Sequence, residues 1–99
     1  MFNTINDYIA FAESIPDEQW TTGQYGKEKG PNCFIGHLFY KQRCWPKPSV
    51  LMMCGFKSQD EAVDINDGNH PRYQQPTPKA RILAALHDAK EKAESEAVT

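Results

Sequence analysis

The sequence predicts a small, mostly α-helical domain of about four helices around a buried central helix. Apolar residues recur at helical spacing in the N-terminal, central and C-terminal segments. Prolines, glycines and capping residues bound those segments, as they do at the ends of helices. The chain has 99 residues, of which 39% are hydrophobic and 24% charged, as in one globular domain. We therefore expect residues 1–99 to form a single helical domain whose tail frays from about residue 95.

The first helix is predicted over residues 3–14. Thr4 and Asp7 have the spacing of a capping box, with Asp in the acidic place. Pro16 ends this helix, because the residue before a proline avoids the α region. A single short turn is expected to follow over residues 16–20. The apolar face of the helix consists of Ile5, Tyr8, Ile9, Phe11 and Ala12.

The central helix is predicted over residues 33–42, with Asn32 as its N-cap. The polar segment 21–30 before it contains three glycines, which predicts a loop or a minor β-hairpin around Gly26. The helix is apolar nearly all round, which is typical of a buried helix. Gly36 within it favours a close approach by another element.

Shorter elements are predicted in the second half of the chain. Two prolines make residues 44–48 a connector, and a short apolar helix follows over 49–54. Ser58 and Glu61 match a capping box for one more turn. The alternating residues 63–65 favour a very short strand, and the stretch 66–69 a turn.

The last helix begins at Pro78, because Thr77 is a good N-cap and proline is favoured at the first helical position. Asp88 is spaced to pair with Lys92, and Lys90 with Glu94, one turn along the helix. The predicted core face consists of Ile82, Leu83, Leu86, Ala89 and Ala93.

The composition excludes several classes of protein. A net charge of -2 lacks the dominant basic surface that general nucleic-acid binding requires. No apolar run approaches the roughly 20 residues of a membrane span. Residues 1–14 contain Asp7 and Glu13 where a signal peptide would be basic and then apolar. Together with an odd cysteine count of three, this predicts a cytoplasmic protein in a reducing compartment.

A cysteine nucleophile is one hypothesis for the stretch GPNCFIGHLFYK, residues 30–41. Cys33 stands at a predicted helix start, where the helix dipole favours a thiolate. His37 lies one turn along the same helix, and His70 in a polar loop is the other candidate base. The alternative is that Cys33 is a small buried apolar residue, as free cysteines usually are.

A metal site is not predicted. The side-chain types that suit zinc occur at Cys33, His37, Cys44, Cys54 and His70. They form no C-x-x-C or H-x-x-x-H pair, so we expect no metal and no cofactor.

A ligand site is predicted between the 20–30 loop, the start of the central helix and the 66–73 turn. A glycine-bearing loop that runs into a helix start offers free backbone N–H groups to an anion. Aromatic side chains in these segments can stack on a base, although no Walker or dinucleotide pattern is present. The predicted ligand-binding residues are Trp20, Thr22, Tyr25, His37, Asn66, Asp67, Asn69, His70, Arg72 and Tyr73.

Four short patterns occur in a fixed order along residues 15–90. They are Trp20 with Gly23; Cys33, Gly36, His37 and Leu38; Asn66, Asp67 and Gly68; and Pro76, Thr77, Pro78, Arg81, Leu83 and Leu86. In order and spacing the chain resembles a family of short bacterial and phage proteins known only as a domain of unknown function. The segment 40–60 departs from that pattern. The resemblance implies a bacterial or phage setting, no established activity, and a joint role for Trp20, His37, Asn66 and Asp67.

The sequence hypothesis is therefore a small binding protein rather than an enzyme. Its partner is expected to be a host protein or a small anionic ligand such as a nucleotide, with counter-defence as the role by analogy. The alternative is a Cys-His hydrolase or transferase that uses Cys33. A homodimer is also predicted, through apolar surface at Trp45, Met52, Met53 and Phe56.

Overall fold

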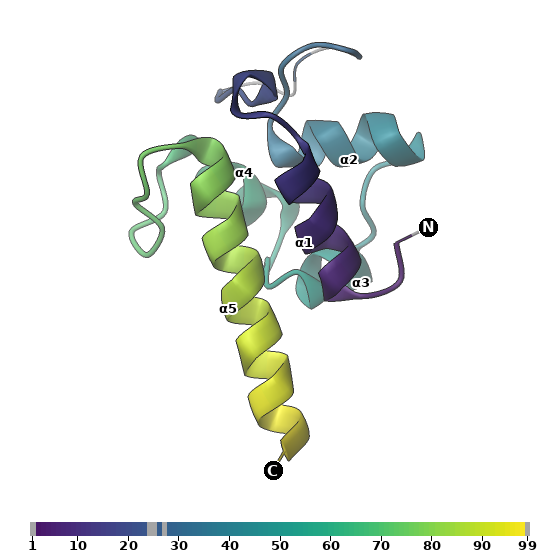
Figure 1. Ribbon diagram of the computed structural model, residues 1–99, viewed down its shortest axis with the longest axis vertical. Coiled ribbons are helices and arrows are strands. Elements are labelled where there is room, and N and C mark those ends of the chain that lie inside the picture. Colours follow the sequence, from purple (N-terminus) through teal and green to yellow (C-terminus); the bar gives the residue numbers. More distant parts are fainter. Residues whose placement is uncertain (1, 24–25, 27, 99) are drawn as a thin grey trace.

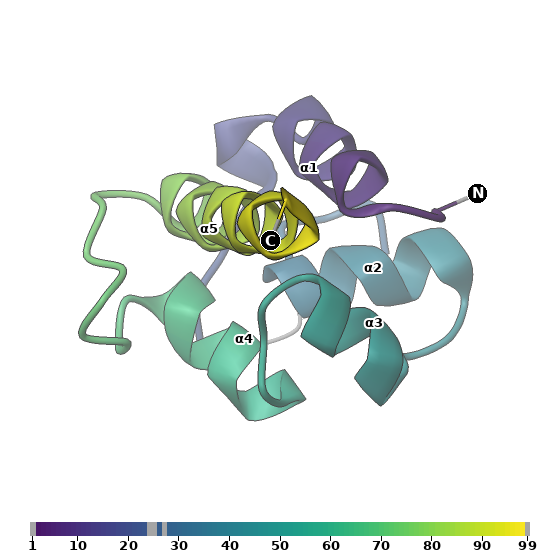
Figure 2. The same cartoon turned by 90° about the horizontal axis from the view of Figure 1, so that it is seen from below.

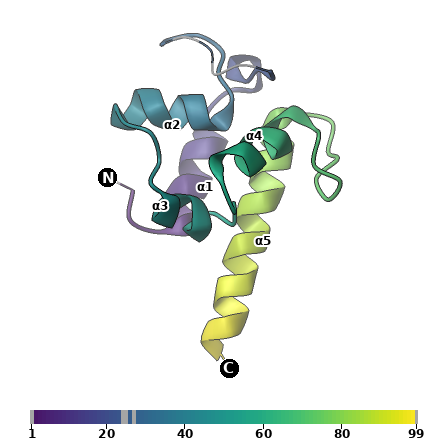
Figure 3. The same cartoon turned by 180° about the vertical axis from the view of Figure 1, so that it is seen from behind.

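The chain folds into helices joined by short connections, and the computed structural model describes residues 2–23, 26 and 28–98. Figure 1 shows these helices, and Figures 2 and 3 show them from below and from behind. Within the described residues there are α1 (Ile5–Ser14), the 3-10 turn η1 (Asp17–Gln19), α2 (Phe34–Gln42), α3 (Pro48–Met53), α4 (Gln59–Asp67) and α5 (Pro78–Val98).

Helix α1 begins with the predicted capping box. The Asp7 carboxylate accepts hydrogen bonds from the backbone N–H groups of Asn3 at 2.8 Å and Thr4 at 2.9 Å. These bonds favour the ionised acid and hold the pKa of Asp7 below its usual value. The helix ends before Pro16, as predicted, and buries Tyr8, Ile9 and Ala12.

Helix α2 corrects the predicted N-cap. The cap is Cys33, whose Sγ accepts from the Gly36 N–H at 3.4 Å. Asn32 is not the cap, because its backbone is already paired with an earlier segment. Its N–H donates to the Gln19 carbonyl at 2.9 Å, and its carbonyl accepts from the Thr21 N–H at 3.0 Å. This pairing is an isolated parallel bridge, and the described residues of the 20–30 loop form no hairpin.

Helix α4 is longer than predicted. Ser58 caps it by accepting from the Glu61 N–H at 3.1 Å, as the capping box indicates. The helix then continues to Asp67 and includes both the predicted strand 63–65 and the first half of the predicted turn. Burial of Ala62, Ile65 and Asn66 on one face explains the difference, because this spacing is that of a helix. Gly68 ends the helix at a φ of 82°.

Helix α5 also runs further than predicted. Thr77 accepts from the Ala80 N–H at 3.1 Å, which confirms it as the cap. The helix continues to Val98, past the point at which fraying was expected, and its last turns project beyond the other helices (Figure 1). Ala93, predicted in the core, is exposed there. Strong helix formers in residues 84–94 account for the extension.

The core lies where the first half of α5 meets α1 on one side and α4 on the other (Figure 2). The buried first half of α2 contacts α4, so the predicted central helix is confirmed in that half. The fully buried apolar side chains include Tyr8, Phe34, Ile35, Leu38, Phe56, Ile65, Ile82 and Leu86. The protein is thus a mostly helical domain, as the sequence predicts.

Candidate functional site

Four elements meet at a group of polar and aromatic residues, which we call the junction cluster: Trp20, His37, Asn66, Asp67 and Arg81. Asn66, at the end of α4, is completely buried. Its Oδ1 accepts from the Phe34 N–H, the first of α2, at 3.1 Å, and its Nδ2 donates to the Thr21 carbonyl at 2.8 Å. One amide therefore joins α4 to the start of α2 and to the loop before it.

Asp67 and Arg81 extend this cluster. Asp67 accepts from the Gly23 N–H at 3.0 Å and from the Asn66 amide at 3.0 Å. The Arg81 guanidinium is buried and donates to the carbonyls of Ile65, Asn66 and Gln75, at 2.7–3.2 Å. A cation at these last carbonyls of α4 complements the negative end of the helix dipole.

The ring side chains of the cluster also have their contacts within the protein. Trp20 stacks on Phe34 with 5.9 Å between ring centroids, and its indole N–H donates to the Ile15 carbonyl at 3.2 Å. His37 Nε2 lies 2.7 Å from the Gln19 carbonyl, so this nitrogen carries the proton. Burial lowers the pKa of His37, which favours the neutral ring. The four residues for which the family resemblance implies a joint role, Trp20, His37, Asn66 and Asp67, thus connect the elements that meet at this junction.

The predicted Cys-His pair lacks the geometry of a nucleophile and its base. Cys33 is 1% exposed, and burial raises the pKa of its thiol, which disfavours the thiolate. The Nε2 of His37 is bonded to a backbone carbonyl, and His70 lies in a different site, described below. The arrangement favours the structural alternative for Cys33, a capping residue inside the core.

The candidate metal ligands are dispersed. Cys33 and Cys54 are buried, and burial raises the pKa of Cys54 to about 12, whereas Cys44 is exposed. Within the described part of the chain, no three His, Cys, Asp or Glu side chains are grouped so that they could hold a metal ion.

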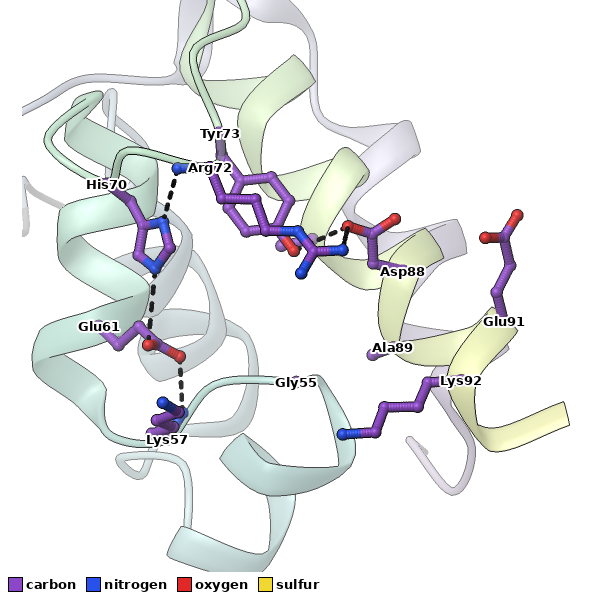
Figure 4. A pocket seen from close by; sticks show the side chains of 11 residues that line it. Gly55, Lys57, Glu61, His70, Arg72, Tyr73, Asp88, Ala89, Glu91 and Lys92 are labelled. Atoms are coloured by element: carbon purple, nitrogen blue, oxygen red, sulfur yellow. Dashed lines mark hydrogen bonds and ion pairs between the residues drawn. The ribbon is translucent and has the colours of Figure 1, made fainter. Parts of the chain in front are cut away.

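A second polar site, which we call the α4–α5 pocket, lies between the start of α4, the 70–73 loop and the middle of α5 (Figure 4). Its volume is about 630 Å³, within the roughly 300–1,000 Å³ range of small-molecule sites. The residues that line it are Gly55, Lys57, Glu61, His70, Arg72, Tyr73, Ala85, Asp88, Ala89, Glu91 and Lys92.

On the α4 side of the pocket, His70 bridges two segments. Its Nδ1 accepts from the Arg72 N–H at 3.2 Å, which leaves the proton on Nε2. That nitrogen lies 3.7 Å from a carboxylate oxygen of Glu61. The other Glu61 oxygen accepts from the Lys57 N–H at 2.9 Å, so one oxygen of this carboxylate has a backbone donor and the second faces His70.

On the α5 side, Asp88 collects two donors from the loop. The Tyr73 hydroxyl donates to it at 2.8 Å, and an Arg72 nitrogen lies 3.3 Å from the same oxygen. Burial, with the Asp88 carboxylate beside it, raises the pKa of Tyr73 to about 12, so the hydroxyl stays a donor. Asp88 therefore pairs with Arg72 and not, as predicted, with Lys92.

Two ammonium groups in the lining of this pocket are available to a ligand. Both bridging carboxylates, Glu61 and Asp88, already have donors. Among the described residues the amino groups of Lys57 and Lys92 have no hydrogen bond or ion pair to an acid. Lys92 points toward the segment at Gly55, whereas Glu91 points away from it (Figure 4). An anion would gain ammonium partners here without displacing an existing bond.

Small residues form the floor of the pocket. Gly55 ends α3 at a φ of 88°, and a Cβ built on it would lie 2.8 Å from the Cβ of Ala89. Only glycine allows α5 to approach the α3–α4 corner this closely. With Ala85, these residues line the pocket without bulky side chains.

The structure separates the predicted ligand residues into two sets. Trp20, His37, Asn66 and Asp67 belong to the junction cluster, whereas His70, Arg72 and Tyr73 line the α4–α5 pocket. Thr22 and Asn69 are exposed outside both, and Tyr25 lies outside the described residues. Sequence reasoning missed Lys57, Glu61, Asp88 and Lys92 as pocket residues, although the i,i+4 spacing of the last two places them on one helix face.

The predicted dimer surface is only partly exposed. Phe56 belongs to the core, at 1% exposed, and Met53 is half-buried. Trp45 and Met52 are 46% and 70% exposed. The homodimer stays a prediction, now limited to these two side chains.

Comparison with models of known protein families, with curated proteins and with solved structures found no match. The resemblance to short bacterial and phage proteins therefore stays a prediction. Among the described residues, no helix has both the length and the apolar composition that crossing a bilayer demands.

Proposed function

We propose that this chain is a small non-enzymatic binding protein that holds a small anionic ligand in the α4–α5 pocket. One observation carries the proposal. Lys57 and Lys92 face a cavity in which the carboxylates of Glu61 and Asp88 already have donors. A phosphate or carboxylate group is the chemical partner that these ammonium groups lack.

The other residues of the pocket suit a ligand that carries a planar ring in addition to its anionic group. The Tyr73 ring is half-buried at the wall, 5.4 Å between centroids from the His70 ring and 5.8 Å from the Arg72 guanidinium. The glycine and alanines in the lining leave room for a planar group. Aromatic and guanidinium surfaces stack on nucleobases, which makes a nucleotide the preferred class of ligand.

Binding rather than catalysis is the better-supported function, because His70 and Tyr73 of this pocket both face partners within the protein. Both nitrogens of His70 face partners, at Arg72 and Glu61, and Tyr73 keeps its proton. The alternative hydrolase or transferase would need Cys33 as its nucleophile, and that thiol is buried away from His70. A cytoplasmic location, a bacterial or phage origin and a counter-defence role rest on composition and on the family resemblance, and we keep them as proposals.

Adenosine monophosphate is a direct test of this function, with adenosine as the uncharged comparison. We expect saturable shifts of pocket resonances in NMR titrations with the monophosphate and much weaker shifts with adenosine. Lys92→Gln should weaken monophosphate binding by about three- to tenfold, the size of one charge-assisted contact at a partly exposed site.

Lys47→Gln provides the matched control, because Lys47 is exposed in the α2–α3 connector, away from the residues that line the pocket. It should leave the affinity unchanged. Absence of shifts at millimolar monophosphate, or an equal loss in the two lysine variants, would count against an anion site in this pocket.

A protein partner is the second candidate, and the exposure of Trp45 and Met52 favours it. A second copy of the chain is the simplest such partner. Light scattering at high micromolar concentration should then show a dimer that Met52→Lys dissociates. A monomer at that concentration would remove the homodimer from consideration.

A further inference from the structure

A second cavity lies between α1 and the end of α2, and it shares no lining residue with the α4–α5 pocket. It has a volume of about 830 Å³ and is lined by Phe2, Asp7, Ala10, Phe11, Lys41, Gln42 and Cys44. Figures 1 and 3 show why these residues meet, since the N-terminal segment and the connector after α2 lie on the same side of the molecule. We call this site the α1–α2 cavity.

Aromatic rings form its apolar wall. Phe2 folds back over α1, with its ring centroid 4.9 Å from that of Tyr8 and 5.2 Å from that of Phe11. Phe2 and Phe11 are both half-buried, and Ala10 beside them is exposed. An apolar ligand could cover this wall, because apolar surface exposed in a concave site is typical of ligand-binding sites.

Of the polar side chains at the rim of the cavity, some already have partners within the protein and one does not. Asp7 is committed to the capping box of α1. The Gln42 side chain is hydrogen-bonded to Tyr8. Lys41 is exposed and has no hydrogen bond or ion pair among the described residues. One available positive charge therefore stands beside an aromatic wall.

We infer that the α1–α2 cavity binds an amphiphile with an apolar chain and a single anionic head group, such as a medium-chain carboxylate. The apolar chain of the ligand would cover the rings of Phe2 and Phe11, and its anionic head group would pair with Lys41. A peptide fits less well, because the side chains at the rim offer one available charge and the lining includes no strand edge with free backbone groups. This site is independent of the function proposed for the α4–α5 pocket.

Cys44 makes this inference testable without a modified protein. Of the three cysteines, all within the described residues, only Cys44 is exposed, and it lines the cavity. A ligand in the cavity should therefore slow the reaction of Cys44 with a thiol reagent. A ligand in the α4–α5 pocket, which contains no cysteine, should leave that rate unchanged.

The experiment measures this rate in the folded protein with decanoate, below its micelle-forming concentration. At ten times the dissociation constant we expect the rate to fall by roughly tenfold, since only unoccupied protein reacts. Lys41→Gln should weaken decanoate binding by about two- to fivefold, as for an exposed charge pair, and leave the binding of decan-1-ol unchanged. Calorimetry on both ligands gives the affinities.

A substitution that fills the cavity provides a second test of the inference. Ala10→Trp places a bulky ring at an exposed position on the rim and should abolish protection of Cys44. Ala93→Trp, at an exposed position of α5, is the matched control and should leave protection intact. The inference is overturned if decanoate gives no protection at millimolar concentration, if Lys41→Gln weakens both ligands equally, or if the two tryptophan variants behave alike.

Discussion

The junction cluster and the α4–α5 pocket both hold polar side chains against α4, yet those side chains have different partners. In the junction cluster Asn66 and Arg81 bond mainly to backbone N–H and carbonyl groups, and both are buried. In the pocket, Arg72 and Asp88 bond to each other at an open surface. Side chains that satisfy buried backbone groups fix the fold, whereas side chains paired with one another beside a cavity can exchange partners with a ligand.

This difference explains the short patterns of the sequence. The Trp-x-x-Gly and Asn-Asp-Gly patterns both supply the junction cluster, through Trp20, Gly23, Asn66 and Asp67. Arg81 adds the cation that caps α4. Residues of these patterns therefore help to join α2, α4 and α5, and the ligand site that we propose lies elsewhere.

The largest expected effect is that of Arg81→Met. Methionine keeps the apolar stem but leaves the carbonyls of residues 65, 66 and 75 without their donor, so we expect a loss of about 3 kcal/mol or more in the free energy of unfolding. Arg43→Met is the matched control, because Arg43 pairs with Glu28 at the surface, and it should cost less than about 1 kcal/mol. Urea denaturation measures both. Equal losses would remove the distinction between the two regions.

Asn66→Ala should have the next largest effect. It leaves the Phe34 N–H and the Thr21 carbonyl unpaired, at an expected cost of about 2–4 kcal/mol. Asn69→Ala, three residues later and exposed, should change stability by no more than about 0.5 kcal/mol. Calorimetric melting of the two variants gives this comparison, and a cost at Asn66 as small as that at Asn69 would contradict its role in the junction.

The pH dependence of stability tests the neutral state of His37. Its pKa is lowered in the folded protein, so below the unfolded value of about 6.5 the unfolded chain binds more protons. Stability should therefore be highest above about pH 6.5 and fall as the pH drops, by about 1 kcal/mol or less because the ring is only partly buried. His37→Gln should remove this loss in urea denaturation at pH 7.5 and 5.5. His87→Gln is the exposed control, and an identical loss in both variants would assign the effect to another group.

The smallest expected effect on stability is in the pocket. Asp88→Asn removes the partner of Arg72, whose side chain is 70% exposed, and should change the free energy of unfolding by less than about 1 kcal/mol. The same variant frees the guanidinium and removes a negative charge, so adenosine monophosphate should bind about threefold more tightly. Titration of the variant by NMR measures this gain. Weaker binding, with stability unchanged, would show that Asp88 itself serves the ligand.

Helices whose ends depend on local chemistry could be predicted from the amino-acid sequence. The capping box at Thr4 and the side-chain caps at Ser58 and Thr77 act within a few residues of the backbone groups that they satisfy, and the stop at Pro16 is equally local. Such interactions do not require the rest of the fold, and the predicted helical class followed from them and from apolar spacing.

Tertiary structure decided the features that depend on distant partners. Cys33 rather than Asn32 caps α2 because Asn32 pairs with the 19–21 segment, and α4 extends to Asp67 because Asn66 finds its partners in α2 and the loop. Likewise, Lys57 and Lys92 stand 35 positions apart in the chain and line one pocket only because α5 packs against the α3–α4 connection at Gly55. Spacing along the chain carries no signal for a contact of this kind, because helix docking alone brings the two segments together.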